Sequence, residues 1–211
     1  MRIYTRRGDD GTTGLLFGGR VSKGSARIAL AGAVDEAQAA MGLARAESEP
    51  GSELDQRLIS LERDLYVLMA EVATAPSNRR KLVPAQTLVT AEMVRALEAA
   101  IDELTARTTM PQEFVIPGSN RPSAALDVAR TAVRRAERGV GQLGQGSLVG
   151  EYLNRCSDLL WTMARWQEGE EHLLSRTAPR RARRASGATD EVDEDPAGTD
   201  DPAGTGDGAR S

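Results

Sequence analysis

Apolar residues recur at helical spacing in five separate stretches of the 211-residue chain. The clearest stripe runs from Leu54 to Val72 in alternating steps of four and three residues, which puts one face of a helix against a core. Similar stripes predict helices over 26–46, about 89–104, about 122–138 and about 151–174. Thr90 is a candidate N-cap, and Pro122 suits a first helical turn.

Five amphipathic helices with short links predict an all-α fold, an antiparallel five-helix bundle. We expect three parts: an ordered Gly-rich N-terminal loop over 1–25, the bundle over 26–176, and a tail over 177–211. The tail is first basic and then acidic, and it repeats Asp-Pro-Ala-Gly-Thr. Because it has almost no apolar surface to bury, we expect it to be disordered.

Charge and composition narrow the class of protein. The net charge is −4, but most of the acidic excess lies in the tail, so the remaining body is slightly basic. Such a body suits an anionic ligand, and the bias is too weak to predict nucleic-acid binding. We find no apolar stretch long enough for a membrane helix and no secretory h-region, and there is a single cysteine. We therefore expect a soluble cytoplasmic protein.

The N-terminal loop carries residues typical of a phosphate cradle. Its glycines, including Gly8 and Gly11, let backbone amides approach an anion closely. Thr12 and Thr13 add hydroxyl donors, and Lys23 adds positive charge. Arg20 adds further charge, and Asp9 or Asp10 is a candidate for holding magnesium. The spacing is not that of a P-loop, and an ordinary flexible N-terminus is the alternative.

The fourth predicted helix carries Arg130, Arg134 and Arg138 four residues apart, so the three side chains lie along one flank. Like charges this close need an anion or carboxylates to compensate them. Asp127 and Glu137 offer part of that compensation. The sequence therefore predicts either an anion site or a solvent-exposed ladder of arginine and glutamate.

Four residues of the fifth predicted helix lie on the face opposite its core stripe: Asn154, Asp158, Trp161 and Arg165. A tryptophan between polar groups on an outward face indicates a subunit interface or a ligand cleft.

The reactive side chains of the common catalytic groups are scarce. Cys156 lies on the core stripe and is expected to be a packed, inert thiol, and His172 is expected to be a surface residue. We find no Ser-His-Asp set, no metal-ligand spacing of Cys and His, and no dinucleotide fingerprint. If the protein is an enzyme, its nucleophile is therefore supplied by a substrate or cofactor.

Several motifs, taken together and in order, resemble the PduO-type ATP:cob(I)alamin adenosyltransferases. They lie at Tyr4–Leu15, Gly19–Lys23, Gly32–Glu36, Phe114–Gly118, Val128–Arg138 and Tyr152–Asp158. The resemblance covers residues 1 to about 170. It implies a homotrimer of five-helix bundles with active sites between subunits, ATP in the N-terminal loop, and magnesium on its triphosphate.

The resemblance also implies roles for individual residues. The ATP-binding loop is matched by Thr5, Gly8, Asp9, Gly11, Thr12, Thr13 and Lys23. The nucleotide-binding helix is matched by Arg130, Arg134 and Glu137, with Asn154 near the nucleotide. Asp35 matches a carboxylate that pairs with Arg130 across the interface. Phe114 matches the aromatic residue that helps displace the lower axial base of cobalamin.

The implied reaction transfers the 5′-deoxyadenosyl group of ATP to the cobalt of cob(I)alamin. The implied partners are a flavin-type reductase and an adenosylcobalamin-dependent enzyme. Arg7, Gln38 and the charged turn at 118–121 depart from the family pattern, and they bear more on the cobalamin pocket than on the nucleotide site. The alternatives are an ATP-gated adenosylcobalamin carrier or sensor without turnover, and a structural bundle without a ligand.

Overall fold

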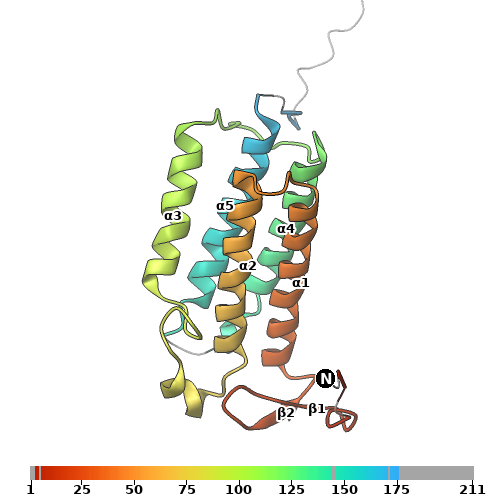
Figure 1. The fold of residues 1–211 in the computed structure, drawn as a ribbon, viewed down its shortest axis with the longest axis vertical. Coiled ribbons are helices and arrows are strands. Elements are labelled where there is room, and N and C mark those ends of the chain that lie inside the picture. The colour runs from red at the N-terminus through yellow and green to blue at the C-terminus, as the bar shows by residue number, and fades with distance from the viewer. Residues whose placement is uncertain (1–2, 5, 144–145, 171, 176–211) are drawn as a thin grey trace, which may run out of the picture. The chain divides into compact units, whose positions relative to one another are not determined.

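The computed structural model describes residues 3–4, 6–143, 146–170 and 172–175. Within them, the α-helices are α1 (Ala26–Ala46), α2 (Glu53–Val72), α3 (Ala91–Ala106), α4 (Arg121–Glu137) and α5 (Val149–Glu168). Figure 1 shows them side by side as a bundle, with α1 packed on α2 and α4, and α5 packed on α3 and α4. The predicted all-α bundle is confirmed.

The core consists of the apolar stripes that the sequence predicts. Leu58, Leu65 and Leu68 of α2 are fully buried, as are Val34 of α1 and Leu126 of α4. Burying one such side chain stabilises the fold by about 1.5–3 kcal/mol. Among the described residues, no helix is long and apolar enough to cross a membrane.

Local capping residues begin the helices where the sequence indicates. The hydroxyl of Thr90 accepts a hydrogen bond from the backbone amide of Met93, as expected of an N-cap. Asn120 caps α4 in a reciprocal capping box with Ser123, and Pro122 lies in the first turn.

The predicted end of α5 near Leu174 is wrong. The helix ends at Glu168, because Gly169 adopts φ +65°, a conformation that stops helical propagation. The chain then returns beside residues 114–116, where Val115 forms an isolated antiparallel bridge with Leu174.

The N-terminal region contains structure that the sequence analysis described only as a loop. β1 (Thr12–Gly14) pairs antiparallel with β2 (Arg20–Ser22), with Thr13 opposite Val21. The amide of Leu16 donates to the carbonyl of Ala73, which ties this hairpin to the C-terminal end of α2. The division predicted at residue 25 stays a prediction, and the predicted disordered tail lies outside the described residues.

Candidate functional site

An open cleft of about 630 Å³ lies along α4 and α5. Its lining comes from three parts of the chain. The loop before α4 contributes Pro111, Gln112, Glu113, Phe114, Val115 and Pro117. The helices contribute Asp127, Arg130, Arg134, Ser157, Asp158, Trp161 and Arg165, and Ser175 completes the lining. The cleft therefore combines an apolar, aromatic rim with paired charges.

The arginines of α4 form a row that begins inside this cleft. Arg130 and Arg134 line it, while Arg134 and Arg138 border an adjoining hollow of about 460 Å³ together with Glu137. The Nε of Arg130 lies 3.1 Å from Asp127. Within the described part of the chain, the guanidinium of Arg134 has no hydrogen-bond or ion-pair partner. An uncompensated guanidinium at the wall of a cleft is suited to a phosphate or carboxylate ligand.

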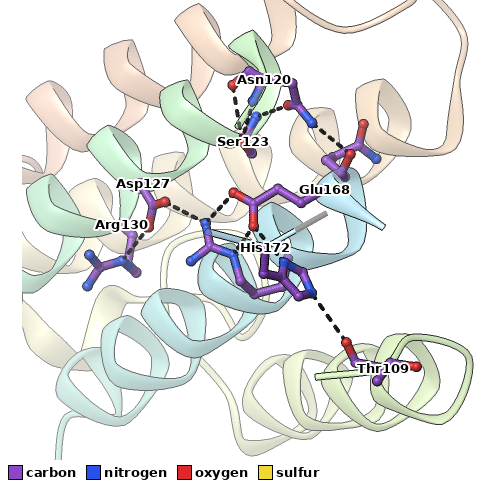
Figure 2. Close-up of polar contacts among 9 residues, drawn as sticks. Thr109, Asn120, Ser123, Asp127, Arg130, Glu168 and His172 are labelled. Atoms are coloured by element: carbon purple, nitrogen blue, oxygen red, sulfur yellow. Dashed lines mark hydrogen bonds and ion pairs between the residues drawn. The ribbon is translucent and has the colours of Figure 1, made fainter. Parts of the chain in front are cut away.

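A network of buried charged side chains joins α4 to the C-terminal end of α5, and Figure 2 shows its polar contacts, with Asp127, Glu168 and His172 labelled. The Nη2 of Arg165 lies 2.6 Å from Oδ2 of Asp127 and 2.9 Å from Oε1 of Glu168. The other oxygen of Glu168 lies 2.9 Å from Nδ1 of His172. Because buried charges are tolerated only when they are paired, this network fixes all its members in one arrangement.

Two predictions about these residues are wrong. Arg165 does not face outward, since it is 1% exposed and its charge is balanced by two carboxylates. His172 is not a surface residue, because its side chain is 9% exposed against Glu168. Glu168 was not among the residues predicted from the sequence. Its spacing of three residues from Arg165 and four from His172 is the helical signal that would have found it.

Phe114 projects at the rim of the cleft and is 87% exposed. Its backbone is nevertheless held, because its carbonyl accepts a hydrogen bond of 2.7 Å from the amide of Ser175. The neighbouring amide of Ile116 donates to the carbonyl of Leu173, also at 2.7 Å. The extended piece expected at 114–118 is thus a short pairing with the segment after α5.

Asn154 and Glu137, both of which the family resemblance links to the nucleotide, contact each other. The amide of Asn154 donates to Oε1 of Glu137 at 3.0 Å, which joins α5 to α4. Arg155 donates to the amide oxygen of Asn154 at 2.6 Å and to Glu98 of α3 at 3.0 Å. These contacts fix which way the Asn154 amide points.

Polar contacts within the N-terminal hairpin organise part of the predicted phosphate cradle. Asp10 accepts hydrogen bonds from the hydroxyl of Thr12 at 2.7 Å and from its backbone amide at 2.9 Å. These bonds are the largest causes that lower the pKa of Asp10, with Arg20 adding to the effect. Arg20 also donates to the carbonyl of Arg7 at 2.6 Å.

Gly8 lies so close to the N-terminal hairpin that a side chain there would force its neighbours to shift. A Cβ at this position would lie 3.1 Å from the Thr12 carbonyl oxygen and 3.2 Å from Nζ of Lys23. Glycine therefore lets the Lys23 ammonium approach the backbone of the loop. At the adjacent start of α1, the Oγ of Ser25 is buried and has no hydrogen-bond partner among the described residues.

The structure of a single chain does not bring every predicted site residue to the cleft. Its lining includes Phe114, Arg130 and Arg134, whereas Glu137 and Asn154 lie farther along α4 and α5. None of the hairpin residues Gly8, Asp9, Gly11, Thr12, Thr13 and Lys23 lines it. Asp35 is exposed on α1 and has no ion-pair partner within the described ranges. Thr5 lies outside the described residues.

The buried thiol expected at Cys156 is confirmed. Cys156 is fully buried, and burial raises the pKa of its thiol far above the ordinary value. A thiol that stays protonated is a poor nucleophile.

Comparisons with known proteins agree with one another. The sequence model of the family described as Cobalamin adenosyltransferase matches residues 3–167. A corrinoid adenosyltransferase of Citrobacter freundii is 40% identical over 171 residues, which cover 79% of this chain and 95% of that protein. A corrinoid adenosyltransferase of Mycobacterium tuberculosis is 39% identical over 170 residues, 78% of this chain and 87% of that protein.

Solved structures show the same likeness. One is a phenylalanine-to-alanine variant of a PduO-type ATP:corrinoid adenosyltransferase from Lactobacillus reuteri, complexed with cobalamin and ATP. It matches with a TM-score of 0.72 and 28% identity over 83% of this chain and 100% of that chain. An arginine-to-lysine variant from the same organism, complexed with ATP, matches with a TM-score of 0.72 and 27% identity over 82% of this chain and 100% of that chain.

Proposed function

The chain belongs to the cobalamin adenosyltransferase family, and we propose that it transfers the 5′-deoxyadenosyl group of ATP to the cobalt of cob(I)alamin. The cobalt electron pair forms a bond to the 5′ carbon of ribose, the bond from that carbon to the phosphate oxygen breaks, and triphosphate leaves with both electrons. The observation that carries the proposal is a cleft whose lining includes both Phe114, an exposed aromatic residue, and Arg134, whose guanidinium has no partner among the described residues.

The arginine row supplies positive charge for the leaving triphosphate. Triphosphate gains negative charge as the carbon–oxygen bond breaks, and fixed guanidinium groups stabilise that charge without reorganising. Arg134 is placed for this task because its charge is not neutralised within the described chain. Arg130 is partly committed to Asp127 through Nε, which leaves its two terminal nitrogens for another carboxylate or a phosphate.

The apolar side chains of the cleft offer a surface on which the corrin ring could pack. Phe114, Val115, Pro117 and Trp161 contribute apolar surface to the lining of the cleft. We assign Phe114 the role of the wedge that keeps the lower axial base away from cobalt. Losing that donor raises the potential for reduction to cob(I)alamin, since a strong axial donor stabilises the more oxidised metal.

We propose that the active form is a homotrimer, because the remaining site residues lie away from the cleft of their own chain. A neighbouring subunit would bring its hairpin, with Thr12, Thr13 and Lys23, to the arginine row. It would also bring Asp35 to the terminal nitrogens of Arg130. This arrangement gives a role to Asp35, an exposed carboxylate on α1 that has no ion-pair partner in the part of the chain that the structure describes.

Magnesium is proposed on the phosphates of ATP. Within the described residues there is no group of three or more His, Cys, Asp or Glu side chains that could hold a metal ion. Asp10 is already bonded to Thr12 and Arg20, which leaves Asp9 as the less committed carboxylate of the loop. A flavin-type reductase and an adenosylcobalamin-dependent acceptor enzyme are the proposed partners, and the cytoplasm is the proposed compartment.

One assay tests the proposal. The full chain is mixed with ATP, magnesium and chemically reduced cobalamin, and the cobalamin absorption spectrum and triphosphate release are followed together. Adenosylcobalamin and triphosphate in equal amounts support the enzyme. A spectral change without triphosphate would instead identify a carrier or sensor, and no change in either signal would identify a structural bundle.

A further inference from the structure

The backbone around Phe114 is held by hydrogen bonds to the segment after α5, and not by the helices that line the cleft. Its side chain is exposed, so packing does little to orient it. The two backbone hydrogen bonds that Phe114 and Ile116 make with Ser175 and Leu173 are therefore its main restraints. The position of Phe114 depends on whatever keeps the segment 172–175 beside it.

His172 is the residue that anchors this segment. Its Nδ1 lies 2.9 Å from Oε2 of Glu168, and its Nε2 lies 3.4 Å from the carbonyl oxygen of Thr109 in the loop after α3. Figure 2 shows the imidazole bridging α5 and that loop. One ring thus joins the end of α5 to the start of the loop that carries Phe114.

Glu168 is in turn held in place by Arg165. Its side chain is fully buried, and Arg165 lies 2.9 Å from each of its oxygens. Arg165 is paired with Asp127, which also holds Arg130. Buried and paired groups of this kind have one low-energy arrangement, so His172 is attached to a rigid base.

We propose that Glu168 and His172 are positioning residues for Phe114, which they hold at the cleft through the segment 172–175. The inference rests on the proposed function and adds to it two residues that do not touch either substrate. A wedge on an unsupported loop would occupy its productive position only part of the time, and misplacement by about 1 Å can lower a rate about 100-fold.

The test compares the wild-type chain with His172→Ala, Phe114→Ala and the double variant. We expect His172→Ala to lower kcat about 10-fold while the KM for ATP stays within about twofold. In the electron paramagnetic resonance spectrum of cob(II)alamin with ATP, the splitting from the axial nitrogen should return. The double variant should be no slower than Phe114→Ala alone, because His172 acts only through the Phe114 ring, which that variant already lacks.

A second variant separates hydrogen bonding from ring packing. His172→Phe keeps a ring but loses both nitrogens, and we expect it to behave as His172→Ala. Hydrogen exchange measured without any substrate should rise at the amides of Ile116 and Ser175 in both variants, and stay unchanged at Leu65 in α2. Glu103→Gln, which breaks an exposed ion pair with Arg57, serves as the control that leaves all readouts unchanged.

The inference is overturned if His172→Phe behaves as wild type, or if His172→Ala slows the Phe114→Ala protein as much as it slows the wild type. Failure of the proposed function is a separate result. In that case the wild-type chain itself makes no adenosylcobalamin, whatever the exchange of Ile116 shows.

Discussion

The carboxylate of Asp127 lies 2.6 Å from Nη2 of Arg165, and both side chains are buried between α4 and α5. The same carboxylate lies 3.1 Å from Nε of Arg130 through its other oxygen. One buried acid therefore connects an arginine that stabilises the fold with an arginine that lines the cleft. This relationship allows the contribution of the buried network to stability to be tested at one position.

Replacing Asp127 with Asn removes the charge and keeps the size of the side chain. We expect the free energy of unfolding to fall by about 3 kcal/mol, because Arg165 loses one of its two buried counterions. Urea denaturation measures this change. The matched control Glu103→Gln breaks an exposed pair and should change stability by less than about 1 kcal/mol. Equal losses in the two variants would contradict the network described above.

Replacing Arg134 with Lys keeps the charge and removes the planar fork. We expect kcat/KM for ATP to fall by about 10- to 100-fold, since one point charge cannot form two parallel bonds to phosphate. Steady-state kinetics with varied ATP measures this loss. Arg95→Lys makes the same exchange at an exposed side chain of α3 and should leave the kinetics unchanged. Near-normal turnover of the Arg134 variant would argue against contact with the nucleotide.

Replacing Phe114 with Ala should affect cobalamin and ATP differently. We expect cobalamin turnover to fall at least about 10-fold. Affinity for ATP, measured by calorimetry, should change little. The melting temperature should also stay near that of the wild type, because an 87% exposed side chain contributes little to the core. Tyr66→Ala removes another exposed aromatic, on α2, and serves as the control. An equal loss of cobalamin turnover and of ATP affinity would contradict the proposed role of Phe114 as the wedge.

Adding one methyl group at Gly8 should loosen the proposed ATP loop. The new Cβ would press on the Thr12 carbonyl and on the end of Lys23, so the KM for ATP should rise several-fold. Gly14→Ala is the matched control, since its Cβ would meet no atom within 4 Å. Identical kinetics for the two variants would show that the approach of Lys23 to Gly8 has no part in ATP binding.

Asp64 gives a prediction about pH and stability. It accepts a 2.8 Å hydrogen bond from Tyr152, yet burial is the larger effect and raises its pKa from the ordinary 3.8. The folded state therefore binds a proton more tightly than the unfolded state does. Asp64 contributes most at low pH, and its contribution declines as the pH rises from the ordinary value through the raised folded value.

The measurement for Asp64 compares unfolding of the wild type and Asp64→Asn across that range of pH. The variant should gain stability relative to the wild type as the pH rises, because it never carries the buried charge. A constant difference at every pH would mean that Asp64 has the same pKa in the folded and unfolded chains.

Much of the fold could be predicted because its signals are local. The stripe of α2, the N-cap at Thr90 and the proline in the first turn of α4 each act within a few residues. The hairpin was missed because its strands have three residues each, too few for an alternating pattern. The end of α5 was misplaced because Leu173 and Leu174 continue an apolar pattern past the glycine that stops the helix.

The sequence by itself determined the bundle, the family resemblance and the row of arginines on α4, since periodicity and motif order are written along the chain. Only the tertiary structure decided that Asp127, Arg165, Glu168 and His172 form one buried network, and that the network reaches the segment beside Phe114. The physical reason is that a charge is stable in a core only beside its partner. Asp127 and Arg165 are 38 positions apart in the sequence, and only the packing of α4 on α5 brings the two partners together.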